Sequence, residues 1–230
     1  MDKSFEKLIK QTKRNVFFNA NDLRLHSICQ NYDYCIPIKK DKDAALVPFK
    51  GDYDIDNASY ALKVADLFIS RDLARKRLKE IKAVSRRFEI LYDKNNIKVI
   101  LDYAHHPTEI KVVLDGVNKV YKDYEKVCIF QPHRVSRLKD LRKKFSLAFK
   151  NADIVVLCPV YSAGEKIKLG FNYINFAKEI IKNSRVKLFL VNDKFQLAKF
   201  IKKNMSGKKI VIGMGAGTIS NWMRELPKLI

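Results

Sequence analysis

Short apolar runs alternate with helical patterns through most of the chain. Each run is rich in Val, Ile and Phe and has the length of a buried strand; the five runs are residues 97–102, 126–131, 153–160, 186–191 and 208–214. The segments between them repeat apolar residues with a period near 3.6, which predicts helices over 107–124, 136–151, 172–183 and 193–205, and a short one after Thr218. Apolar strands joined by helices indicate a parallel sheet covered on both faces. We therefore predict an α/β fold with a doubly wound, Rossmann-like and mostly parallel sheet over residues 88–230.

The first part of the chain, residues 1–87, has a different pattern. It contains few complete strand–helix units and too little chain for an independent core of the usual size. The pattern predicts strands over 16–19 and 44–49 and helices over 22–30, 55–68 and 70–82. We interpret this segment as a partial α/β domain that precedes the larger one.

Composition excludes several classes of protein. Hydrophobic residues make up 47% of the 230 residues, too many for a disordered chain. No apolar run approaches the roughly 18 residues of a membrane span, and the N-terminus has no apolar signal core. The four cysteines form no CxxC pair, which is typical of reduced thiols rather than of a disulfide framework or a zinc site. We expect a cytoplasmic protein with no membrane partner.

The chain is strongly basic, with 46 Lys and Arg against 25 Asp and Glu and a formal net charge of +21. Such charge can favour binding to phosphates. The lysines are spread over many helical segments, however, and no base-stacking or zinc-finger signature accompanies them. We therefore do not expect a dedicated nucleic-acid-binding protein, and an acidic or phosphorylated substrate suits the charge equally well.

Candidate functional residues follow the predicted strands at their carboxyl ends, where ligands bind in open parallel sheets. Asp102, Tyr103, His105 and His106 follow the first run, and residues 131–137 follow the second. A carboxylate at the position of Asp102 can accept hydrogen bonds from ribose hydroxyls or can cap the next helix. Tyr103 is as well suited to packing as to stacking on a base. Because His105 and His106 are adjacent, we expect only one of them to face a ligand.

The segment 132–137 carries a sharper signal. Arg134 and Arg137 lie three residues apart, which on a helical turn places two guanidinium groups on one side. Such groups bind carboxylates and phosphates through paired hydrogen bonds. Positive charge at a helix N-terminus also opposes the helix dipole, so an anionic partner is the simplest compensation. We expect an anion to bind here.

Glycines follow the last predicted strand, in the segment 213–217. Their spacing does not match a dinucleotide-binding fingerprint, and no acidic residue follows at the required distance. The segment instead predicts a tight turn in which the backbone approaches a ligand or another loop. The sequence contains no GxxxxGK[ST] phosphate-binding loop.

Taken together, these segments resemble the Mur ligases, the amide ligases of peptidoglycan synthesis, and in particular the members that join L-alanine to UDP-N-acetylmuramate. The resemblance rests on DYAHHPTE (102–109), FQPHRVSR (130–137), VYSAGE (160–165) and GAGTIS (215–220). Arg86-Arg87-Phe88-Glu89 is similar to the family's junction between its central and C-terminal domains. Residues 51–68 and 19–25 resemble stretches of the central domain, so that 1–87 would be a remnant of it and 88–230 the C-terminal domain.

The resemblance implies an ATP-dependent ligation with Mg²⁺, in which ATP phosphorylates the substrate carboxylate and the amine of L-alanine attacks the acyl phosphate. It implies that Asp102 binds the ribose, that Tyr103 and His105 lie by the nucleotide, that Asn57 belongs to the adenine site and that Arg87 lies near the phosphates. It further implies that His133, Arg134 and Arg137 hold the incoming alanine. No catalytic residue is assigned in this chain, and no metal ligand is expected in it.

The family's UDP-sugar domain, phosphate loop and magnesium-binding acidic residues would all precede Met1. Without that loop, phosphoryl transfer loses most of its electrostatic stabilisation. We therefore expect no ligation by this chain alone, whether it is a fragment, half of a split enzyme or a remnant. Two alternatives remain open: a noncatalytic subunit that docks with a separately encoded N-terminal half, and a metal hydrolase that uses Asp102, His105, His106 and His133.

Overall fold

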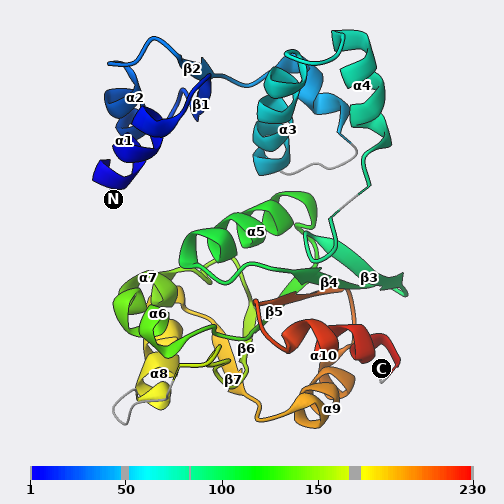
Figure 1. Ribbon diagram of the computed structural model, residues 1–230. Coiled ribbons are helices and arrows are strands. Elements are labelled where there is room, and N and C mark those ends of the chain that lie inside the picture. Colours follow the sequence, from blue (N-terminus) through cyan, green and yellow to red (C-terminus); the bar gives the residue numbers. More distant parts are fainter. Residues whose placement is uncertain (1, 48–51, 83, 166–171, 229–230) are drawn as a thin grey trace. The chain divides into compact units, whose positions relative to one another are not determined.

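A computed structural model describes residues 2–47, 52–82, 84–165 and 172–228. The chain divides into two compact units, residues 1–83 and 84–230, and Figure 1 labels their elements. Arg86 and Arg87 belong to the second unit.

The first unit is mostly helical. Its elements are α1 (Asp2–Gln11), β1 (Val16–Asn19), α2 (Leu23–Cys29), β2 (Cys35–Ile38), a 3₁₀ helix (Lys42–Leu46), α3 (Asp52–Ala65) and α4 (Arg71–Glu80). β1 and β2 pair in parallel. Two small apolar clusters stabilise the unit, one around Ile9, Phe18 and Cys29 and the other around Leu62 and Leu78.

Sequence patterns located several of these elements and missed others. The strand over 16–19 is confirmed, and Asp22 and Ser70 accept backbone hydrogen bonds at the N-termini of α2 and α4. The strand predicted over 44–49 is wrong, because Lys42–Leu46 forms a 3₁₀ helix whose first turn the Asp41 side chain caps; residues 48 and 49 lie outside the described part of the chain. α1 and β2 were not predicted.

The second unit contains a six-stranded sheet of order β3-β4-β8-β5-β6-β7. The strands are β3 (Glu89–Lys94), β4 (Ile97–Asp102), β5 (Glu125–Phe130), β6 (Ile154–Leu157), β7 (Lys187–Leu190) and β8 (Lys209–Met214). All neighbouring pairs are parallel except β3 with β4, which are antiparallel. The predicted doubly wound, mostly parallel sheet is confirmed. The antiparallel edge strand β3 was missed, because its residues are polar or half-exposed.

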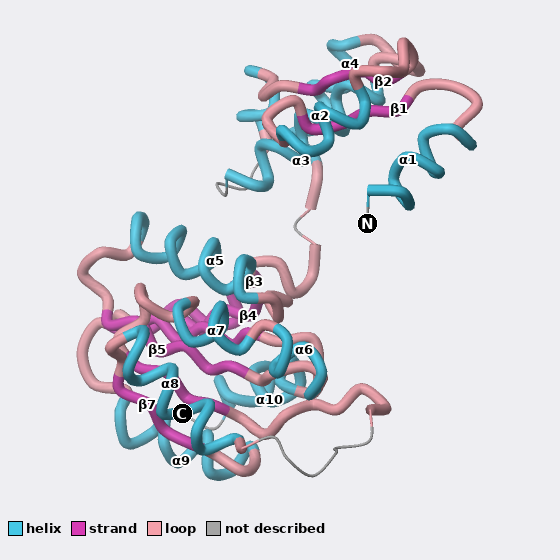
Figure 2. The backbone as a smooth tube through the Cα atoms, turned by 90° about the vertical axis from the view of Figure 1, so that its left-hand side faces the viewer, coloured by secondary structure: helices cyan, strands magenta, loops and turns pink. Residues whose placement is uncertain are grey.

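Helices cover both faces of this sheet. They are α5 (Pro107–Val120), α6 (Val135–Asp140), α7 (Arg142–Leu147), α8 (Tyr173–Ser184), α9 (Lys194–Asn204) and α10 (Ile219–Glu225). Figure 2 shows α5 and α9 on opposite sides of the strands. The single helix predicted over 136–151 is instead two, because the helix breaks at Leu141 and α7 ends at Leu147.

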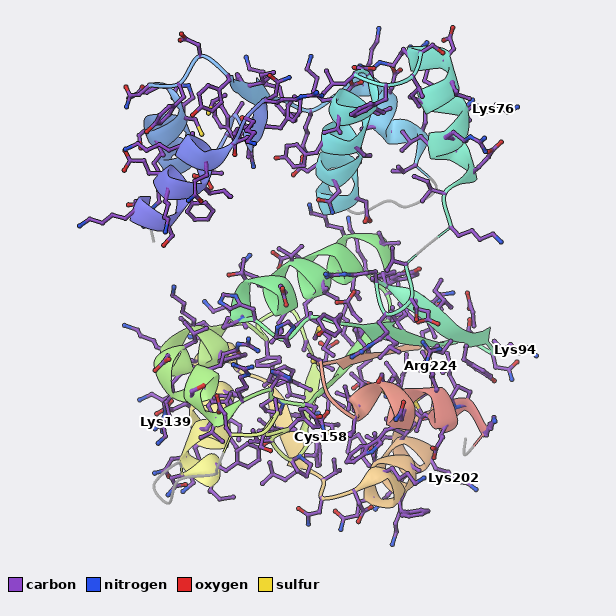
Figure 3. All side chains as sticks on the ribbon, viewed as in Figure 1. Lys76, Lys94, Lys139, Cys158, Lys202 and Arg224 are labelled. Carbon is purple, nitrogen blue, oxygen red and sulfur yellow. The ribbon has the colours of Figure 1, made fainter. Side chains whose placement is uncertain are left out.

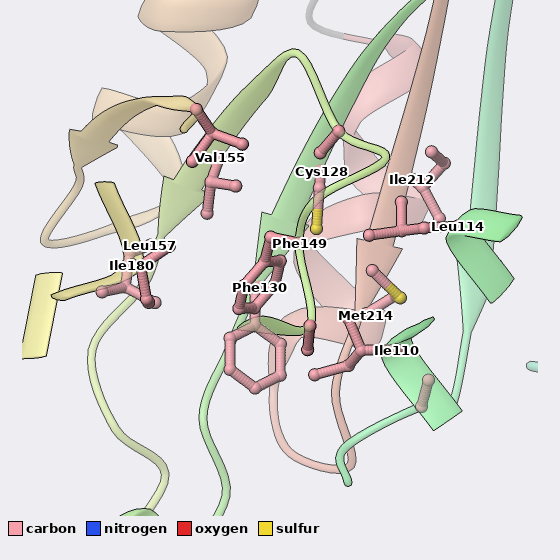
Figure 4. Packing of buried hydrophobic residues seen from close by; sticks show 14 of the residues in the cluster. Ile110, Leu114, Cys128, Phe130, Phe149, Val155, Leu157, Ile180, Ile212 and Met214 are labelled. Carbon is pink, nitrogen blue, oxygen red and sulfur yellow. The ribbon is translucent and has the colours of Figure 1, made fainter. Parts of the chain in front are cut away.

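The alternation of side chains along each strand divides the core into two layers. Ile100, Cys128 and Phe130 pack with α5, α7 and α8 on one face, which Figure 4 shows from close by. Their neighbours Leu101 and Ile129 pack with α9 and α10 on the other face. Both faces of β4, β5, β6 and β8 are buried, so these strands are mostly apolar and their polar residues lie near the ends, whereas the edge strands β3 and β7 are more exposed.

Candidate functional site

The loops that follow β4, β5, β6 and β8 are joined at the carboxyl edge of the sheet. The backbone N–H of Arg134 donates to the carbonyl of Tyr161 at 2.8 Å, and the N–H of Tyr161 donates to that of Pro132 at 2.8 Å. The N–H of Gln131 donates to the carbonyl of Met214 at 3.0 Å. The expectation that these loops meet at one edge is confirmed, and the backbone bonds extend the sheet ladder into the site.

A row of four rings runs along this edge. The centroids of Tyr103 and His105 are 5.1 Å apart, and those of His105 and His133 are 5.6 Å apart. The ring of Tyr161 stacks on His133 at 5.5 Å with an interplanar angle of 24°. The row therefore draws side chains from the loops after β4, β5 and β6 into one continuous surface, with spacings in the range of favourable aromatic contacts.

Arg137 determines the protonation of His133. Its Nη1 lies 3.2 Å from Nδ1 of His133 and 3.4 Å from the His133 carbonyl oxygen. Because a guanidinium group can only donate, Nδ1 must accept, and the ring proton is assigned to Nε2. Burial, together with the positive charge of Arg137, lowers the pKa of His133. His133 is therefore a neutral ring that presents an N–H donor.

His105 has the opposite tautomer. Its Nδ1 lies 3.0 Å from the carbonyl oxygen of Tyr103 and 3.4 Å from Oε2 of Glu109. Both neighbours are acceptors, which assigns the proton to Nδ1 and leaves Nε2 with its lone pair. The adjacent rings of His105 and His133 thus carry a hydrogen-bond acceptor and a donor, respectively.

His106 has a structural role. Its Nδ1 accepts from the N–H of Thr108 at 3.3 Å at the N-terminus of α5, and Glu109 accepts from the N–H groups of His105 and His106 at 2.9 and 3.1 Å. This arrangement is a capping box with Pro107 at the first helical turn. The expectation that only one of the two adjacent histidines faces the site is met by His105. Burial alone would raise the pKa of Glu109, but these N–H groups and the charge of Arg87 lower it.

Asp102 is buried at the end of β4. Its Oδ1 accepts from the N–H of Ala104 at 2.8 Å, and its Oδ2 accepts from the N–H of Phe88 at 2.9 Å. Burial raises the pKa of this carboxyl group, while the two N–H groups and the charge of Arg87 oppose the rise. Asp102 is 1% exposed, and its hydrogen bond to Phe88 holds the turn before β3 against the end of β4. Its role toward a ribose stays a prediction.

Arg86 and Arg87 flank the Tyr103 end of the row. The guanidinium carbon of Arg86 lies 4.5 Å from the centroid of Tyr103, and that of Arg87 lies 5.8 Å from it. Nη2 of Arg86 donates to the carbonyl of Gly215 at 3.1 Å. Arg86 adopts a φ of 63°, a conformation that non-glycine residues rarely take. Two cations therefore lie against one aromatic ring.

The carboxylate of Glu165 binds at the N-terminus of α6. Oε1 of Glu165 accepts from the Ser136 hydroxyl at 2.5 Å, and Oε2 accepts from the Ser136 N–H at 3.1 Å. The Ser136 bonds and the charge of Arg134 lower the pKa of Glu165. The helix-dipole argument for an anionic ligand is therefore met by Glu165. The guanidinium of Arg134 is exposed at the helix start, while Arg137 is turned toward His133.

The glycine segment packs against another loop, one of the two alternatives predicted for it. A Cβ on Gly217 would lie 2.6 Å from Oε1 of Gln131 and 2.6 Å from Cγ of Tyr161. Gln131 is buried, and its side chain accepts from the N–H of Ile219 at 2.9 Å and donates to Oγ1 of Thr218 at 3.0 Å. The small residue thus allows the loops after β5, β6 and β8 to close on one another.

Two further predictions from the sequence concern Asn57 and a metal site. Asn57 lies on α3 of the other unit, where its side chain is exposed, and its assignment stays a prediction. Within the described ranges, no group of three or more His, Cys, Asp or Glu side chains is arranged to hold a metal ion. In the same part of the chain, no helix combines the length and apolar character needed to cross a membrane.

Sequence reasoning assigned no individual role to four residues of this edge: Arg86, Gln131, Tyr161 and Glu165. Gln131 ends one predicted strand, and Tyr161 and Glu165 lie in the segment that follows another, so their position was a usable signal. Arg86 precedes the sheet in the chain, and its contact with Gly215 spans 129 residues of sequence. No local pattern indicates such a contact.

The comparisons with known proteins agree with this architecture. The family model described as "Mur ligase, glutamate ligase domain" matches residues 86–217. The chain belongs to the Mur ligase family. The whole chain aligns with a UDP-N-acetylmuramate–L-alanine ligase of Pelagibacter ubique, at 50% identity over 244 residues and 53% of that protein.

Solved structures of Mur ligases have the same fold. The UDP-N-acetylmuramate–alanine ligase of Thermotoga maritima matches with a TM-score of 0.64 and 28% identity, over 79% of this chain and 38% of that one. A murein peptide ligase of Psychrobacter arcticus matches with a TM-score of 0.71 and 17% identity, over 99% of this chain and 54% of that one. This chain therefore spans about half the length, or less, of the Mur ligases it matches.

Proposed function

We propose that this chain is the C-terminal part of an ATP-dependent Mur ligase that joins L-alanine to UDP-N-acetylmuramate in peptidoglycan synthesis. The observation that carries the proposal is the contact of His105 with His133 beside Arg137 at the carboxyl edge of the sheet. It unites the two motifs on which the likeness to the alanine-adding ligases rests. The 50% identity to such a ligase supports the same substrate pair.

The proposed alanine site uses complementary groups of the edge. The guanidinium groups of Arg134 and Arg137 bind the carboxylate of alanine, because planar cations pair with carboxylates through two hydrogen bonds. His133, neutral and protonated on Nε2, donates a further hydrogen bond. His105 offers the Nε2 lone pair to the amine, which must be unprotonated to act as a nucleophile. The two tautomers thus match the two ends of an amino acid.

The proposed nucleotide site lies at the other end of the row. The faces of Tyr103 and the cations of Arg86 and Arg87 suit an anionic nucleotide, and Nε of Arg86 is buried without a hydrogen-bond partner among the described residues. Asp102 would meet the ribose with lone pairs that its two N–H partners leave free. ATP, when bound, supplies the phosphoryl group that activates the muramate carboxylate. The described residues offer no cluster for Mg²⁺, so no step is assigned to it here.

Calorimetric titration tests these roles on the isolated chain. We expect Arg134→Ala/Arg137→Ala to weaken L-alanine binding at least about tenfold, since two charge-assisted contacts are lost, while binding of a nonhydrolysable ATP analogue changes less than about twofold. Lys139→Ala is the matched control, because it removes a charge from the same helix at an exposed position. Unchanged alanine affinity in the double variant would contradict the proposal.

A phosphate-release assay tests the ligase itself. We propose that turnover of UDP-N-acetylmuramate, L-alanine and ATP requires a phosphate-binding loop from outside this sequence, in the same polypeptide or in a separate N-terminal half. The isolated chain should release no phosphate above background. Addition of the remaining portion of the Pelagibacter ubique relative should restore phosphate release. That portion should also co-purify with this chain. Substantial turnover by this chain alone would refute the requirement.

A further inference from the structure

A second concave surface lies at the amino ends of β5, β6 and β7, the edge of the sheet opposite the candidate site. It is an open groove of about 1180 Å³, formed by the segments 122–126, 150–153 and 182–187. These segments join α5 to β5, α7 to β6 and α8 to β7. Because the candidate site follows the carboxyl ends of the same strands, the groove is a separate feature of this unit.

The groove is basic. Six of the residues that line it are cationic, namely Lys122, Lys126, Lys150, Lys182, Arg185 and Lys187. Three are acidic, and two of these already have partners: Glu125 pairs with Lys209, and Asp153 accepts from the backbone N–H of Lys126 at 2.7 Å. None of the six cations forms an ion pair within the described residues, so the surface carries uncompensated positive charge.

Lys126 is the least expected of these cations. It lies in β5 and is only 8% exposed. Its Nζ donates to the carbonyl oxygen of Lys122 at 3.1 Å. An ammonium group has three donors, and the other two have no partner among the described residues. Because Lys126 lines the groove, its two remaining donors are available to an anion that binds there.

Helix ends explain part of the charge. In this fold the C-termini of the helices reach the amino edge of the sheet, and basic side chains there complement the helix dipoles. Lys182 in the last turn of α8 fits this explanation. Lys126, on a strand, and Lys187, at the start of β7, do not. The surplus is a property of the groove rather than of its helices.

We propose that this groove binds a linear chain of phosphate groups, as in a condensed inorganic phosphate. An open groove lined by cations from three segments suits an extended anion, and lysine ammonium groups bind phosphates as point charges without demanding one geometry. The lining offers little to a base: its aromatic residue is Tyr124, whose ring packs at 5.7 Å on that of Tyr121. The groove therefore recognises phosphate charge without stacking.

Isothermal titration calorimetry with linear polyphosphate of about 15 units tests the proposal. We expect saturable binding that weakens steeply between about 50 and 200 mM salt, because phosphate contacts release counterions. Lys126→Met keeps most of the apolar stem and should weaken binding about tenfold through loss of the ammonium group that lines the groove. Lys150→Ala/Lys187→Ala changes exposed positions and should weaken binding about fivefold, whether or not Lys126→Met folds.

Lys202→Ala/Lys203→Ala is the matched control. It removes two exposed charges from α9, at a part of the unit that Figure 3 marks with Lys202. The control should retain affinity within about twofold, because it removes the same number of charges as the groove double variant but leaves the groove lining unchanged. Three results would overturn the proposal: no binding, equal losses in control and groove variants, or tighter binding per phosphate by a single-stranded oligonucleotide. L-Alanine binding at the opposite edge should be unaffected by the groove variants, which separates this test from that of the ligase.

Discussion

Replacing Asp102 by alanine should loosen the turn that leads into the sheet. The carboxylate joins the end of β4 to Phe88, 14 residues earlier in the chain, because one oxygen accepts from Phe88 and the other from Ala104. In the variant both N–H groups lose their acceptor. Ala104 is fully buried, so its N–H has no access to water, whereas Phe88 is half-buried. The loss is therefore concentrated at Ala104.

The expected magnitude follows from these contacts. A buried donor without an acceptor costs about 1–3 kcal/mol, and removal of the buried charge returns part of this as relieved desolvation. We expect Asp102→Ala to lower the free energy of unfolding by about 2–3 kcal/mol. Asp102→Asn retains one acceptor oxygen and should lose only about 1–2 kcal/mol. For a unit of this size, the alanine variant should melt roughly 4–12 °C lower than the wild type.

Stability should also depend on pH through this residue. The folded-state pKa of Asp102 is raised above its ordinary value by burial. The contribution of the protonated carboxyl is then fully present below the unfolded pKa of about 4 and is lost as the pH rises through the folded value. Asp102→Asn cannot ionise, so its deficit relative to the wild type should be larger at pH 4 than at pH 7.

Urea unfolding followed by the fluorescence of Trp222 is a suitable assay. Trp222 is the single tryptophan of the chain and packs on the core between the sheet, α9 and α10, so its signal reports on the second unit. Lys94→Ala, an exposed change on β3, serves as the control. A loss below about 0.5 kcal/mol for Asp102→Ala, or a greater loss for the asparagine variant, would refute this account of the turn.

Three further predictions concern other parts of the chain. Gly217→Ala should destabilise the second unit by about 1–3 kcal/mol in the same urea assay, because the added methyl group overpacks against Gln131 and Tyr161. Gly116→Ala, where the space around the glycine is open, is the control. Equal stability of the two variants would contradict the close approach at Gly217. Glu89, whose pKa its bonds to Arg224 lower to about 2, should contribute stability that is present above pH 4.5 and is lost as the pH falls toward 2, so Arg224→Gln should lose less stability than the wild type between pH 5 and pH 3. The exposed apolar side chains of α3, α4 and their connection (Val64, Leu67, Phe68, Ile69 and Leu73) should cause self-association in light scattering, and a monodisperse monomer at high concentration would count against this.

Local sequence determined the elements of the second unit to a large extent. Apolar runs located β4, β5, β6 and β8 because strands buried on both faces admit few polar residues, and β7 was located by its short apolar run although it is largely exposed. Pro107 predicted the start of α5, and His106 is the N-cap found there. The break at Leu141 was not predicted, because the apolar period continues through it and only packing distinguishes one bent helix from two.

The carboxyl-edge site was predictable in its location and only partly in its contacts. Sequence placed His105 and His133 after strands, and a parallel sheet brings such ends to one side. Sequence did not indicate that Glu165 occupies the start of α6 or that Tyr161 stacks on His133, since both contacts cross between separate loops. Arg137 was expected to face a ligand together with Arg134. Its contact with His133 was not expected, because it depends on where the row of four rings places the His133 side chain.

Sequence alone therefore determined the fold class and the edge of the sheet that carries the motifs, because strand periodicity and local capping act over a few residues. The motifs themselves indicated the family. Only the tertiary structure decided which loops touch, since the strand order places β8, last in the chain, between β4 and β5. That order brings Gly215 to Arg86 and Gly217 to Tyr161 across long stretches of sequence. The same packing sets the tautomers of the two histidines and forms the basic groove at the opposite edge. No local sequence pattern indicates this packing.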